Sequence, residues 1–302
     1  MIKYKVSKHC VHEPISRKTF VIINYLFLTG VTIVSLMPLV NILAMSFSDT
    51  LAVAANEVKF WPVGFTFTSY SHVIANATFY TSFLISVKRA VLGVSINMIL
   101  SILAAYPLSK ADSVFRARKF YVWVFMFTMV FSGGVVPLFM VVKYTHIYNT
   151  IWALIFPGAV NVFNILILMN FFRELPGEIE ESAFIDGAGH WTILFKIYLP
   201  LAKAALATLV LFFFVEHWNS WFDGLIYMSN KERYPLQTYL QSILAIPDVS
   251  KMTPQELEAF GKINIRSIKA AEIFIAAVPI LAVYPFLQKY FTKGIVLGSV
   301  KG

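Results

Sequence analysis

Six long apolar stretches dominate the sequence, and each is long enough to cross a bilayer as a helix. They lie at about residues 20–47, 80–108, 120–142, 151–172, 204–228 and 268–288. The hydrocarbon core of a bilayer is about 30 Å thick, which takes about 20 helical residues to cross. Backbone groups without a partner are costly there, so helix is the only reasonable conformation for a single apolar stretch. The sequence therefore predicts an all-α integral membrane protein with six transmembrane helices.

Composition and charge exclude several other classes. The chain is 58% hydrophobic and 14% charged, whereas soluble domains contain about 45–50% apolar and about 25% charged residues. The net charge of +9 does not indicate nucleic-acid binding, because the basic residues flank apolar stretches instead of gathering on a soluble domain. Cys10 is the single cysteine, which excludes an intramolecular disulfide, and no metal-ligand pattern surrounds it.

The distribution of Lys and Arg predicts the orientation. With the N-terminus in the cytosol, the inside segments 1–19, 108–119, 173–203 and 289–302 carry 15 basic residues. The outside segments 47–79, 143–150 and 229–268 carry 7. Because cytosolic loops carry the excess of Lys and Arg, we expect both termini in the cytosol. The predicted organisation is a cytosolic N-terminal tail (1–19), a transmembrane domain (20–288) and a cytosolic C-terminal tail (289–302).

The predicted cytosolic loop 173–203 reads as two short helical pieces. The first lies within 174–189, where Pro176 suits a first turn, Glu178, Glu180 and Glu181 complement the helix dipole, and glycines 187 and 189 can end the helix. The second, 191–199, is apolar on one side and is expected to stop at Pro200. This amphipathic helix–turn–helix is too short to fold alone. We expect it to expose Ala183, Phe184 and Ile185 for docking on another protein.

At these residues the chain resembles the permease subunits of ABC importers. Those permeases carry a cytosolic loop of the pattern E-A-A-x3-G-x9-I-x-L-P. The matching residues here are Glu181, Ser182, Ala183, Gly187, Ile197, Leu199 and Pro200. Ser182 is the one departure, a small residue in place of the first alanine. The resemblance implies the fold of a type I ABC importer permease, the binding-protein-dependent transport inner membrane component.

The resemblance also implies a mechanism. In that family the first short helix is a coupling helix, seated in a groove of an ATP-hydrolysing subunit, where Glu181 and Asp186 would face basic or polar groups and Gly187 would permit the turn. Closure of two ATP-binding subunits would then move the helix and the spans with it. The chain contains no G-x4-G-K-[ST] phosphate loop. We therefore expect this chain to bind no cofactor and to be no enzyme, with ATP and Mg used by a separate ATPase.

Over nearly its whole length the chain resembles permeases of the carbohydrate uptake family, particularly the branch for oligosaccharides and polysaccharide fragments. The similar stretches are 60–70, 131–137, 218–222 and 291–302. The resemblance implies that this chain lies in the bacterial cytoplasmic membrane and has four partners. They are a second, different permease, a dimer of ATP-binding subunits, an extracytoplasmic solute-binding protein and an oligosaccharide.

Two further segments have roles only by analogy. The tail resembles that of a maltose-transporter permease, which enters the interface between ATPase subunits; the residues concerned are Lys293, Gly294, Gly298, Lys301 and Gly302. The alternative is a basic end without structure. The outside loop 229–268 either reaches toward the docked binding protein or is a connector.

Polar residues within the predicted spans are candidates for contact with the cargo, because polar groups are costly in a bilayer. The fifth span contains Glu216, His217, Trp218, Asn219 and Trp221, and the fourth contains Asn161 and Asn164. Such a mixture suits a sugar, with hydroxyl hydrogen bonds and aromatic faces. The alternative is that these residues bridge neighbouring helices.

Two other functions remain open from the residues alone. One is a secondary transporter driven by an ion gradient through an ionisable pair such as Glu216 and His217, although no inverted repeat is visible. The other is an ABC permease for a solute that is not a sugar.

Overall fold

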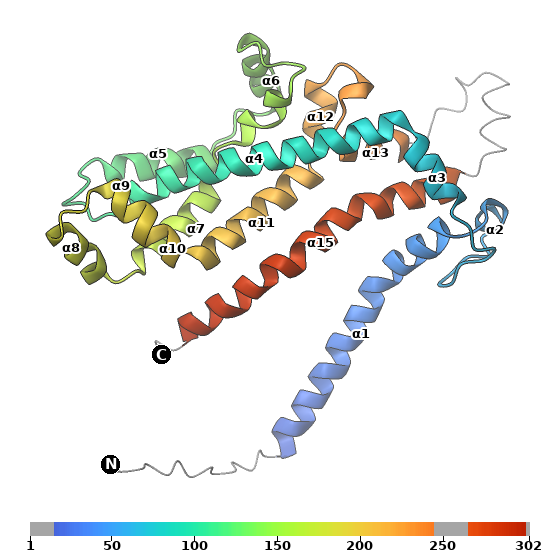
Figure 1. The fold of residues 1–302 in the computed structure, drawn as a ribbon, viewed down its shortest axis with the longest axis horizontal. Coiled ribbons are helices and arrows are strands. Elements are labelled where there is room, and N and C mark those ends of the chain that lie inside the picture. Colours follow the sequence, from blue (N-terminus) through green and yellow to red (C-terminus); the bar gives the residue numbers. More distant parts are fainter. Residues whose placement is uncertain (1–14, 245–264, 300–302) are drawn as a thin grey trace. The chain divides into compact units, whose positions relative to one another are not determined.

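The computed structural model describes residues 15–244 and 265–299, and the described residues form helices joined by turns (Figure 1). The chain divides into two compact units. The first comprises Met1–Tyr70 and Pro254–Ala271, and the second comprises Ser71–Thr253 and Glu272–Gly302. Among the described residues, three helices are each long and apolar enough to cross a membrane, and counting each bent helix pair as a single span gives up to six.

In the first unit the main element is α1 (Ile15–Ser46), which covers the predicted first span. Its side chains are exposed up to residue 40, and they are apolar on all sides. A helix of this kind is stable only where lipid or another apolar partner surrounds it. After it come α2 (Thr50–Ala54) and α3 (Thr68–Ala75). Phe47 packs against Phe65, Phe67 and Tyr70 with ring centroids 4.8–5.6 Å apart.

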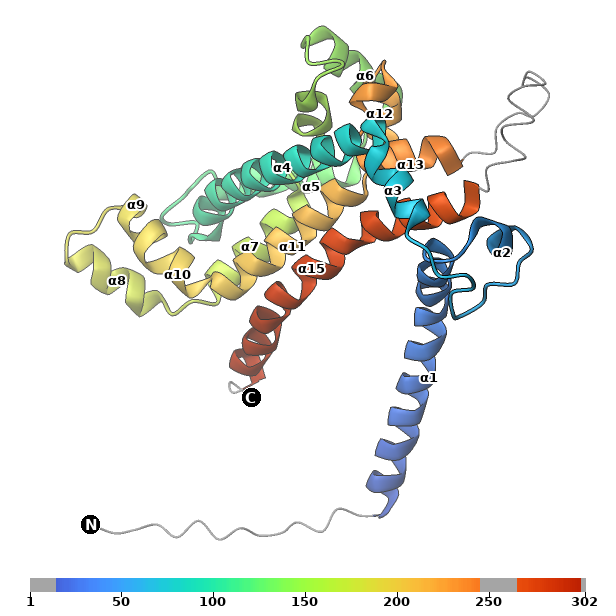
Figure 2. The ribbon, with the colours of Figure 1, turned by 45° about the vertical axis from the view of Figure 1, so that its right-hand side comes forward.

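In the second unit α4 (Ala77–Ser109) is the central helix and matches the predicted second span. It begins at Asn76, whose Oδ1 accepts hydrogen bonds from the backbone N–H groups of Thr78 and Phe79 at 3.0 and 3.2 Å. It packs mainly against α7 (Val162–Arg173) and α11 (Lys203–Asn219), and α4 and α11 run side by side in two views (Figure 2).

Three predicted spans are not single helices. The stretch 120–142 is divided into α5 (Arg118–Val130) and α6 (Val135–Tyr144), which meet at 114°. Gly133 and Gly134 lie at the break, where their wide conformational range permits the turn. The stretch 151–172 is divided into the short 3-10 turns η1 (Ile151–Leu154) and η2 (Phe156–Gly158) and the helix α7, with a bend of 52°.

The predicted fifth span, 204–228, is also interrupted. Helix α11 has 17 residues and ends at Asn219, and α12 (Phe222–Tyr227) follows after Ser220 and Trp221. A 17-residue helix is about 25 Å long, which is shorter than a bilayer core. The break brings Asp223 of α12 into contact with Arg89 of α4. The remaining elements on this side are η4 (Lys231–Arg233) and α13 (Leu236–Leu244).

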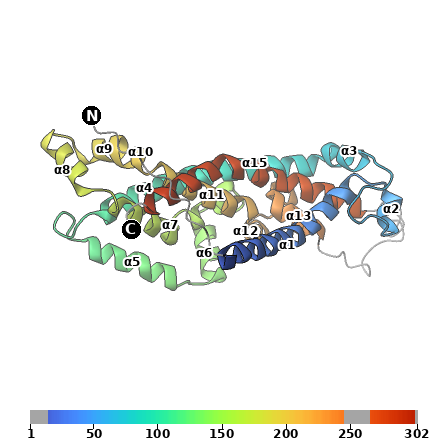
Figure 3. The ribbon, with the colours of Figure 1, turned by 90° about the horizontal axis from the view of Figure 1, so that it is seen from below.

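The core of the second unit lies between α4, α7, α11 and the loop that precedes α11. Its fully buried residues come from all of these elements, namely Ala105, Ile165, Leu168, Ile193, Ala202, Leu209 and Phe213. Seen from below, α8, α9 and α10 of that loop gather at the end of the unit where α4 stops (Figure 3). The last helix, α15 (Ile265–Ser299), contains the predicted sixth span and continues beyond its predicted end at residue 288.

Candidate functional site

The first half of the predicted coupling loop is α8 (Gly177–Ile185), with Glu178 and Glu180 in its first turn. The helix ends at Ile185, and Gly187 turns the chain after it, as the sequence predicts. Gly187 has a φ of +79°, its N–H donates to the carbonyl of Phe184 at 3.0 Å, and the N–H of Ala188 donates to the carbonyl of Ala183 at 2.9 Å. These two bonds form a Schellman motif, in which a left-handed residue ends the helix and satisfies its last carbonyls.

The exposed face of α8 differs from the expectation at one residue. Ile185 is 86% exposed and Phe184 is 42% exposed, but Ala183 is buried at 9%. The prediction that Ala183 is presented for docking is therefore wrong. It packs into the core of the unit, since the third position of the motif is on the inner side of the helix. Glu181, Ser182 and Asp186 are exposed.

The second half of the loop is a helix in three parts. These are α9 (His190–Ile193), the π-helical turn η3 (Leu194–Tyr198) and α10 (Leu199–Leu201). The sequence predicts that this helix stops at Pro200, but the helix continues one residue further, to Leu201. The chain turns instead at Ala202, which is fully buried, and α11 leaves at 81°. Ile197 and Leu199 pack against the core.

Lys110 follows the last residue of α4 and joins α4 to the loop. Its Nζ lies 2.6 Å from Oε1 of Glu180 on α8 and donates to the hydroxyl of Tyr198 in η3 at 3.0 Å. The same Nζ stands 4.0 Å from the ring centroid of Tyr106 and 4.1 Å from that of Tyr198. We call Lys110, Glu180, Tyr198 and Tyr106 the Lys110 cluster.

The Lys110 cluster is shielded from water. The Lys110 side chain is 7% exposed and that of Glu180 is 18% exposed. Burial lowers the pKa of Lys110, because the charged form loses hydration, and the Glu180 carboxylate opposes this change. An ammonium group between two aromatic faces and a carboxylate is stabilised by cation–π and ionic interactions together.

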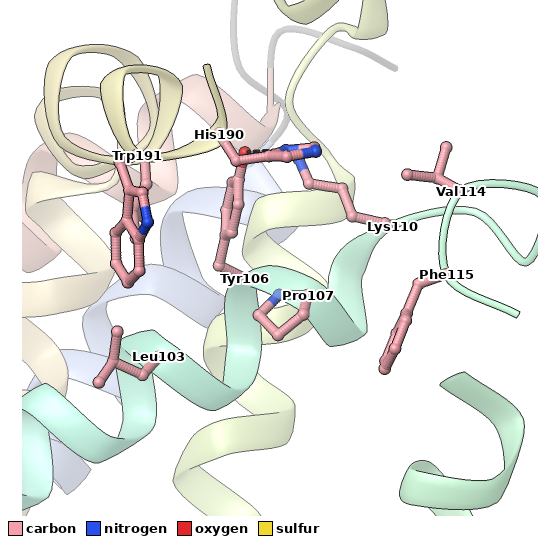
Figure 4. Close-up of a pocket in the computed structure, with 9 residues that line it drawn as sticks. Leu103, Tyr106, Pro107, Lys110, Val114, Phe115, His190 and Trp191 are labelled. Carbon is pink, nitrogen blue, oxygen red and sulfur yellow. Dashed lines mark hydrogen bonds between the residues drawn. The ribbon is translucent and has the colours of Figure 1, made fainter. Parts of the chain in front are cut away.

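Beside this cluster lies a mainly apolar cavity of about 410 Å³. Figure 4 shows the lining residues, with Tyr106 beneath His190, Lys110 to one side of Tyr106, and Trp191 above Leu103 on the other side. The Tyr106 hydroxyl and Nδ1 of His190 are 3.3 Å apart. Trp191 is 64% exposed, so this side of the loop presents an aromatic surface near α8.

The cargo candidates from the sequence divide between two cavities. The first, of about 300 Å³, is lined by Glu216 and His217 together with Arg89 and Asp223, and we call it the charged cavity. Arg89 is 3% exposed and forms a two-pronged ion pair with Asp223, with one N–O distance of 3.2 Å. The amide of Asn161 reaches Oε2 of Glu216 at 3.4 Å.

The second cavity has a volume of about 310 Å³ and is lined by Asn219 and Trp221 of the α11–α12 break. Gln237 and Gln241 of α13 line it as well. Its other residues are apolar, from α13 and α15 (Leu240, Ile273, Ala276, Ala277 and Ile280). We call it the amide cavity. Three amide side chains offer both donors and acceptors, and Trp221 adds an aromatic face.

Two candidates lie in the protein interior. Trp218 is 2% exposed, its Nε1 donates to the carbonyl of Ala276 at 3.0 Å, and its ring stacks on Phe214. It joins α11 to α15. Asn164 is 3% exposed, and its backbone N–H donates to the side chain of Asn161 at 3.2 Å.

Sequence reasoning missed Arg89, Lys110 and Gln241. Arg89 had a usable signal, because a charge in the middle of a predicted span marks a functional or bridging residue. Lys110 had none, since it lies in a basic loop segment where lysine is ordinary. Gln241 had none either, because only the fold of α13 turns it toward α11.

The tail and the outside loop are only partly described. Lys293, Gly294 and Gly298 belong to α15, whereas Lys301 and Gly302 lie outside the described residues. Helix α15 thus runs through positions that the sequence assigns to a separate tail. In the predicted outside loop 229–268, α13 packs against α4 with Leu236 fully buried, and residues 245–264 lie outside the description.

Comparison with known proteins places this chain. The family described as "Binding-protein-dependent transport system inner membrane component" matches residues 97–297. Protein LplC of Bacillus subtilis is 38% identical over 97% of this chain and 99% of its own length. The polygalacturonan/rhamnogalacturonan transport system permease protein YtcP of the same organism is 37% identical over 94% and 99%.

Two solved structures share the fold. One chain, from the crystal structure of a bacterial ABC transporter involved in the import of the acidic polysaccharide alginate, is 31% identical, with a TM-score of 0.83 over 92% of this chain and 99% of that one. Another, from the alginate transporter in complex with a periplasmic protein carrying an alginate pentasaccharide, is 15% identical with a TM-score of 0.55, which shows the fold alone.

The fold class and family predicted from the sequence are confirmed. This chain belongs to the family of binding-protein-dependent transport system inner membrane components, as a multi-pass permease subunit of an ABC importer whose ATP is hydrolysed by a separate subunit.

Proposed function

We propose that this permease imports oligosaccharides derived from an acidic polysaccharide. The observation that carries the proposal is sequence similarity, over nearly the full length of this chain, to two proteins whose descriptions state such a cargo. One is the polygalacturonan/rhamnogalacturonan permease at 37% identity, and the other is the alginate transporter chain at 31%. Both cargoes are rich in uronic acids. A third relative, 27% identical, is an arabinooligosaccharide permease of Halalkalibacterium halodurans, which supports oligosaccharide transport more generally.

The complete transporter contains four further polypeptides in this proposal. They are a second, different permease, two ATP-binding subunits and an extracytoplasmic solute-binding protein. One of the two matching structures is the bacterial alginate ABC transporter in complex with a periplasmic protein that carries an alginate pentasaccharide.

Helix α8 is the coupling helix in this proposal. Exposed Ile185 and Phe184 enter the groove of the ATPase, with exposed Glu181, Ser182 and Asp186 at its rim. The other motif residues support the helix from behind. Ala183 seats α8 on the core, Gly187 turns the chain, and Ile197, Leu199 and Pro200 carry the turn into α11.

The amide cavity is the proposed cargo path. Sugar hydroxyls need partners that both donate and accept, which Asn219, Gln237 and Gln241 supply, and Trp221 offers an aromatic face to sugar C–H groups. The charged cavity is less suited to this role, because Arg89 is already paired with Asp223. Glu216 and His217, together with Asn161, therefore connect helices in this proposal, and so do Trp218 and Asn164.

We place both termini in the cytosol, along with the basic loop 108–119 and α8. The bias of Lys and Arg supports this orientation, and so does the structure of the second unit, where α8 and the loop after α4 lie at the same end. The C-terminal residues Lys293, Gly294, Gly298, Lys301 and Gly302 are then placed to reach the ATPase subunits.

The decisive experiment is uptake by the complete transporter in proteoliposomes. We expect import of short galacturonate or alginate oligomers to require ATP and to continue after the proton gradient is collapsed. Neutral oligosaccharides of equal length should be imported more slowly. Uptake that needs the proton gradient and no ATP would identify a secondary transporter instead, and equal or faster uptake of the neutral oligomers would refute the acidic cargo.

A second experiment separates the two cavities. Trp221→Ala and Asn219→Ala should each lower uptake about tenfold without changing the amount of assembled complex, because a lost sugar contact of about 1.4 kcal/mol corresponds to that factor. Trp218→Phe removes the hydrogen bond to Ala276 and part of a buried ring that packs on Phe214, so it should lower thermal stability and leave the cargo dependence of uptake unchanged. Normal uptake by both alanine variants would refute the amide cavity as the cargo path.

A further inference from the structure

Two adjacent glutamates of α8 have opposite environments. Glu181, the glutamate of the loop motif, is exposed. Glu180 is turned inward, with its side chain 18% exposed and one carboxylate oxygen 2.6 Å from Nζ of Lys110. The hydroxyl of Tyr198 donates to its other carboxylate oxygen. The motif alone gives no reason for a carboxylate at position 180, so this contact needs a separate explanation.

The Lys110 cluster connects three elements that are distant in sequence. Lys110 directly follows α4, Glu180 lies in α8 70 positions later, and Tyr198 in η3 is 88 positions from Lys110. Nζ of Lys110 also stands 4.0 and 4.1 Å from the ring centroids of Tyr106 and Tyr198. The ammonium group is thus fixed from three sides. A buried ion pair does not guarantee stability, but it does define one relative placement of its partners.

Helix α8 has little means of keeping its own position. It has nine residues, which is too few for a helix to be stable in isolation. Ala183 is the only buried residue of the helix. Its outward residues Phe184 and Ile185 follow Glu180 by four and five positions, about one helical turn. Any displacement applied to those residues therefore acts on Glu180 and, through it, on Lys110 and α4.

Helix α4 is well placed to pass that displacement on, because it packs mainly against α7 and α11. Helix α11 leads directly to Asn219 at the amide cavity. We propose that Lys110 is a positioning residue for transport, which fixes the coupling helix α8 to the end of α4 through Glu180 and Tyr198 so that movement of the ATPase is transmitted to the spans. This inference rests on the proposed docking of α8 on the ATPase.

The test measures the number of ATP molecules hydrolysed per cargo molecule imported, with the complete transporter in proteoliposomes. Lys110→Met preserves the length of the side chain and removes its charge. Glu180→Gln preserves shape and weakens the ionic contact. We expect both variants to assemble with the ATPase and to hydrolyse ATP, while the ratio of ATP to cargo rises about tenfold, within the usual range of coupling between sites. A purely structural role would lower the amount of complex and leave this ratio unchanged.

Lys119→Met is the matched control, because Lys119 lies in the first turn of α5 just after the same loop, is 78% exposed and pairs only with Asp112 among the described residues. It should retain the normal ratio. The double variant Lys110→Met/Glu180→Gln should be no worse than Lys110→Met if the two residues act as one unit. A normal ratio in the assembled Lys110→Met or Glu180→Gln complex would overturn the proposal, and so would failure of both variants to assemble.

Ile185→Asp distinguishes this inference from the proposed function beneath it. Ile185 is 86% exposed, so this change spares the fold and should release the ATPase from the purified complex. If the ATPase stays bound and uptake is normal, docking through α8 is wrong. If Ile185→Asp releases the ATPase but the Lys110 and Glu180 variants keep a normal ratio, only the positioning role of Lys110 fails.

Discussion

Gly187 illustrates how much a single residue decides in this protein. Its φ of +79° lies in the left-handed region, and its N–H and that of Ala188 close the end of α8. This conformation directs the chain from α8 back to His190 and Trp191. A residue with a Cβ meets no atom there within 4 Å, so the restriction is one of backbone conformation and not of space.

Gly187→Ala should therefore destabilise the end of α8 by about 1–2 kcal/mol, the cost of a left-handed residue with a side chain. We expect faster amide hydrogen exchange across α8 and weaker retention of the ATPase during purification. The matched control is Gly189→Ala, because Gly189 has a φ of −78° and equally open surroundings. Equal exchange rates in the two variants would show that the Schellman turn does not matter.

At the scale of elements, the contact between α4 and α11 depends on a small residue opposite a large one. A Cβ built on Gly93 of α4 would lie 2.3 Å from Nε2 of His217 on α11. His217 is 5% exposed and its Nε2 lies 3.4 Å from Oδ1 of Asn97. Close approach of two membrane helices generally needs such small residues. The absence of a side chain at Gly93 thus leaves room for the buried ring of His217.

We expect Gly93→Ala to lower the thermal stability of the purified complex, since overpacking costs about 1–3 kcal/mol. The measured quantity is the temperature at which half of the complex is lost, with the remaining complex measured by size-exclusion chromatography. Gly30→Ala in α1 is the control, because no atom lies within 4 Å of its Cβ. Combining Gly93→Ala with His217→Ala should recover part of the loss. A normal midpoint for Gly93→Ala would mean that the two helices are not in close contact.

The breaks within the spans are a second property of elements. Helix α11 stops at Asn219, and Asp223 of α12 then pairs with Arg89 of α4. Asp223 also accepts hydrogen bonds from the hydroxyl of Ser220 and the N–H of Gly224, both at 2.9 Å. A continuous helix would not supply these contacts. The break therefore exchanges backbone hydrogen bonds for a buried ion pair and opens the amide cavity beside it.

At the scale of the whole molecule, orientation determines which end meets the ATPase. We expect Ser113, exposed in the loop after α4, to face the cytosol, and Ser229, exposed after α12, to face outward. Because Cys10 is the only cysteine, it can be replaced by serine before single cysteines are introduced.

In intact cells, a membrane-impermeant thiol reagent should label Ser229→Cys and leave Ser113→Cys unlabelled until the membrane is opened. The physical reason is the excess of Lys and Arg on the cytosolic side. The reverse pattern of labelling would show that the protein has the opposite orientation. Helix α8 would then face away from a cytosolic ATPase, which would contradict the coupling proposal.

By itself the sequence determined the properties that depend on local composition. Apolar length sets the number of membrane crossings, and the spacing from Glu181 to Pro200 identifies the loop and the family, because turns and helix ends depend on neighbouring residues. The positions of the first two spans agree closely with α1 and α4.

Only the tertiary structure decided which polar residues meet. It buried Ala183, broke three predicted spans, separated Trp218 from the amide cavity and brought Lys110 to Glu180 across 70 positions. No local pattern encodes such pairs, since each depends on how separate helices pack and on the cost of leaving a buried charge without a partner.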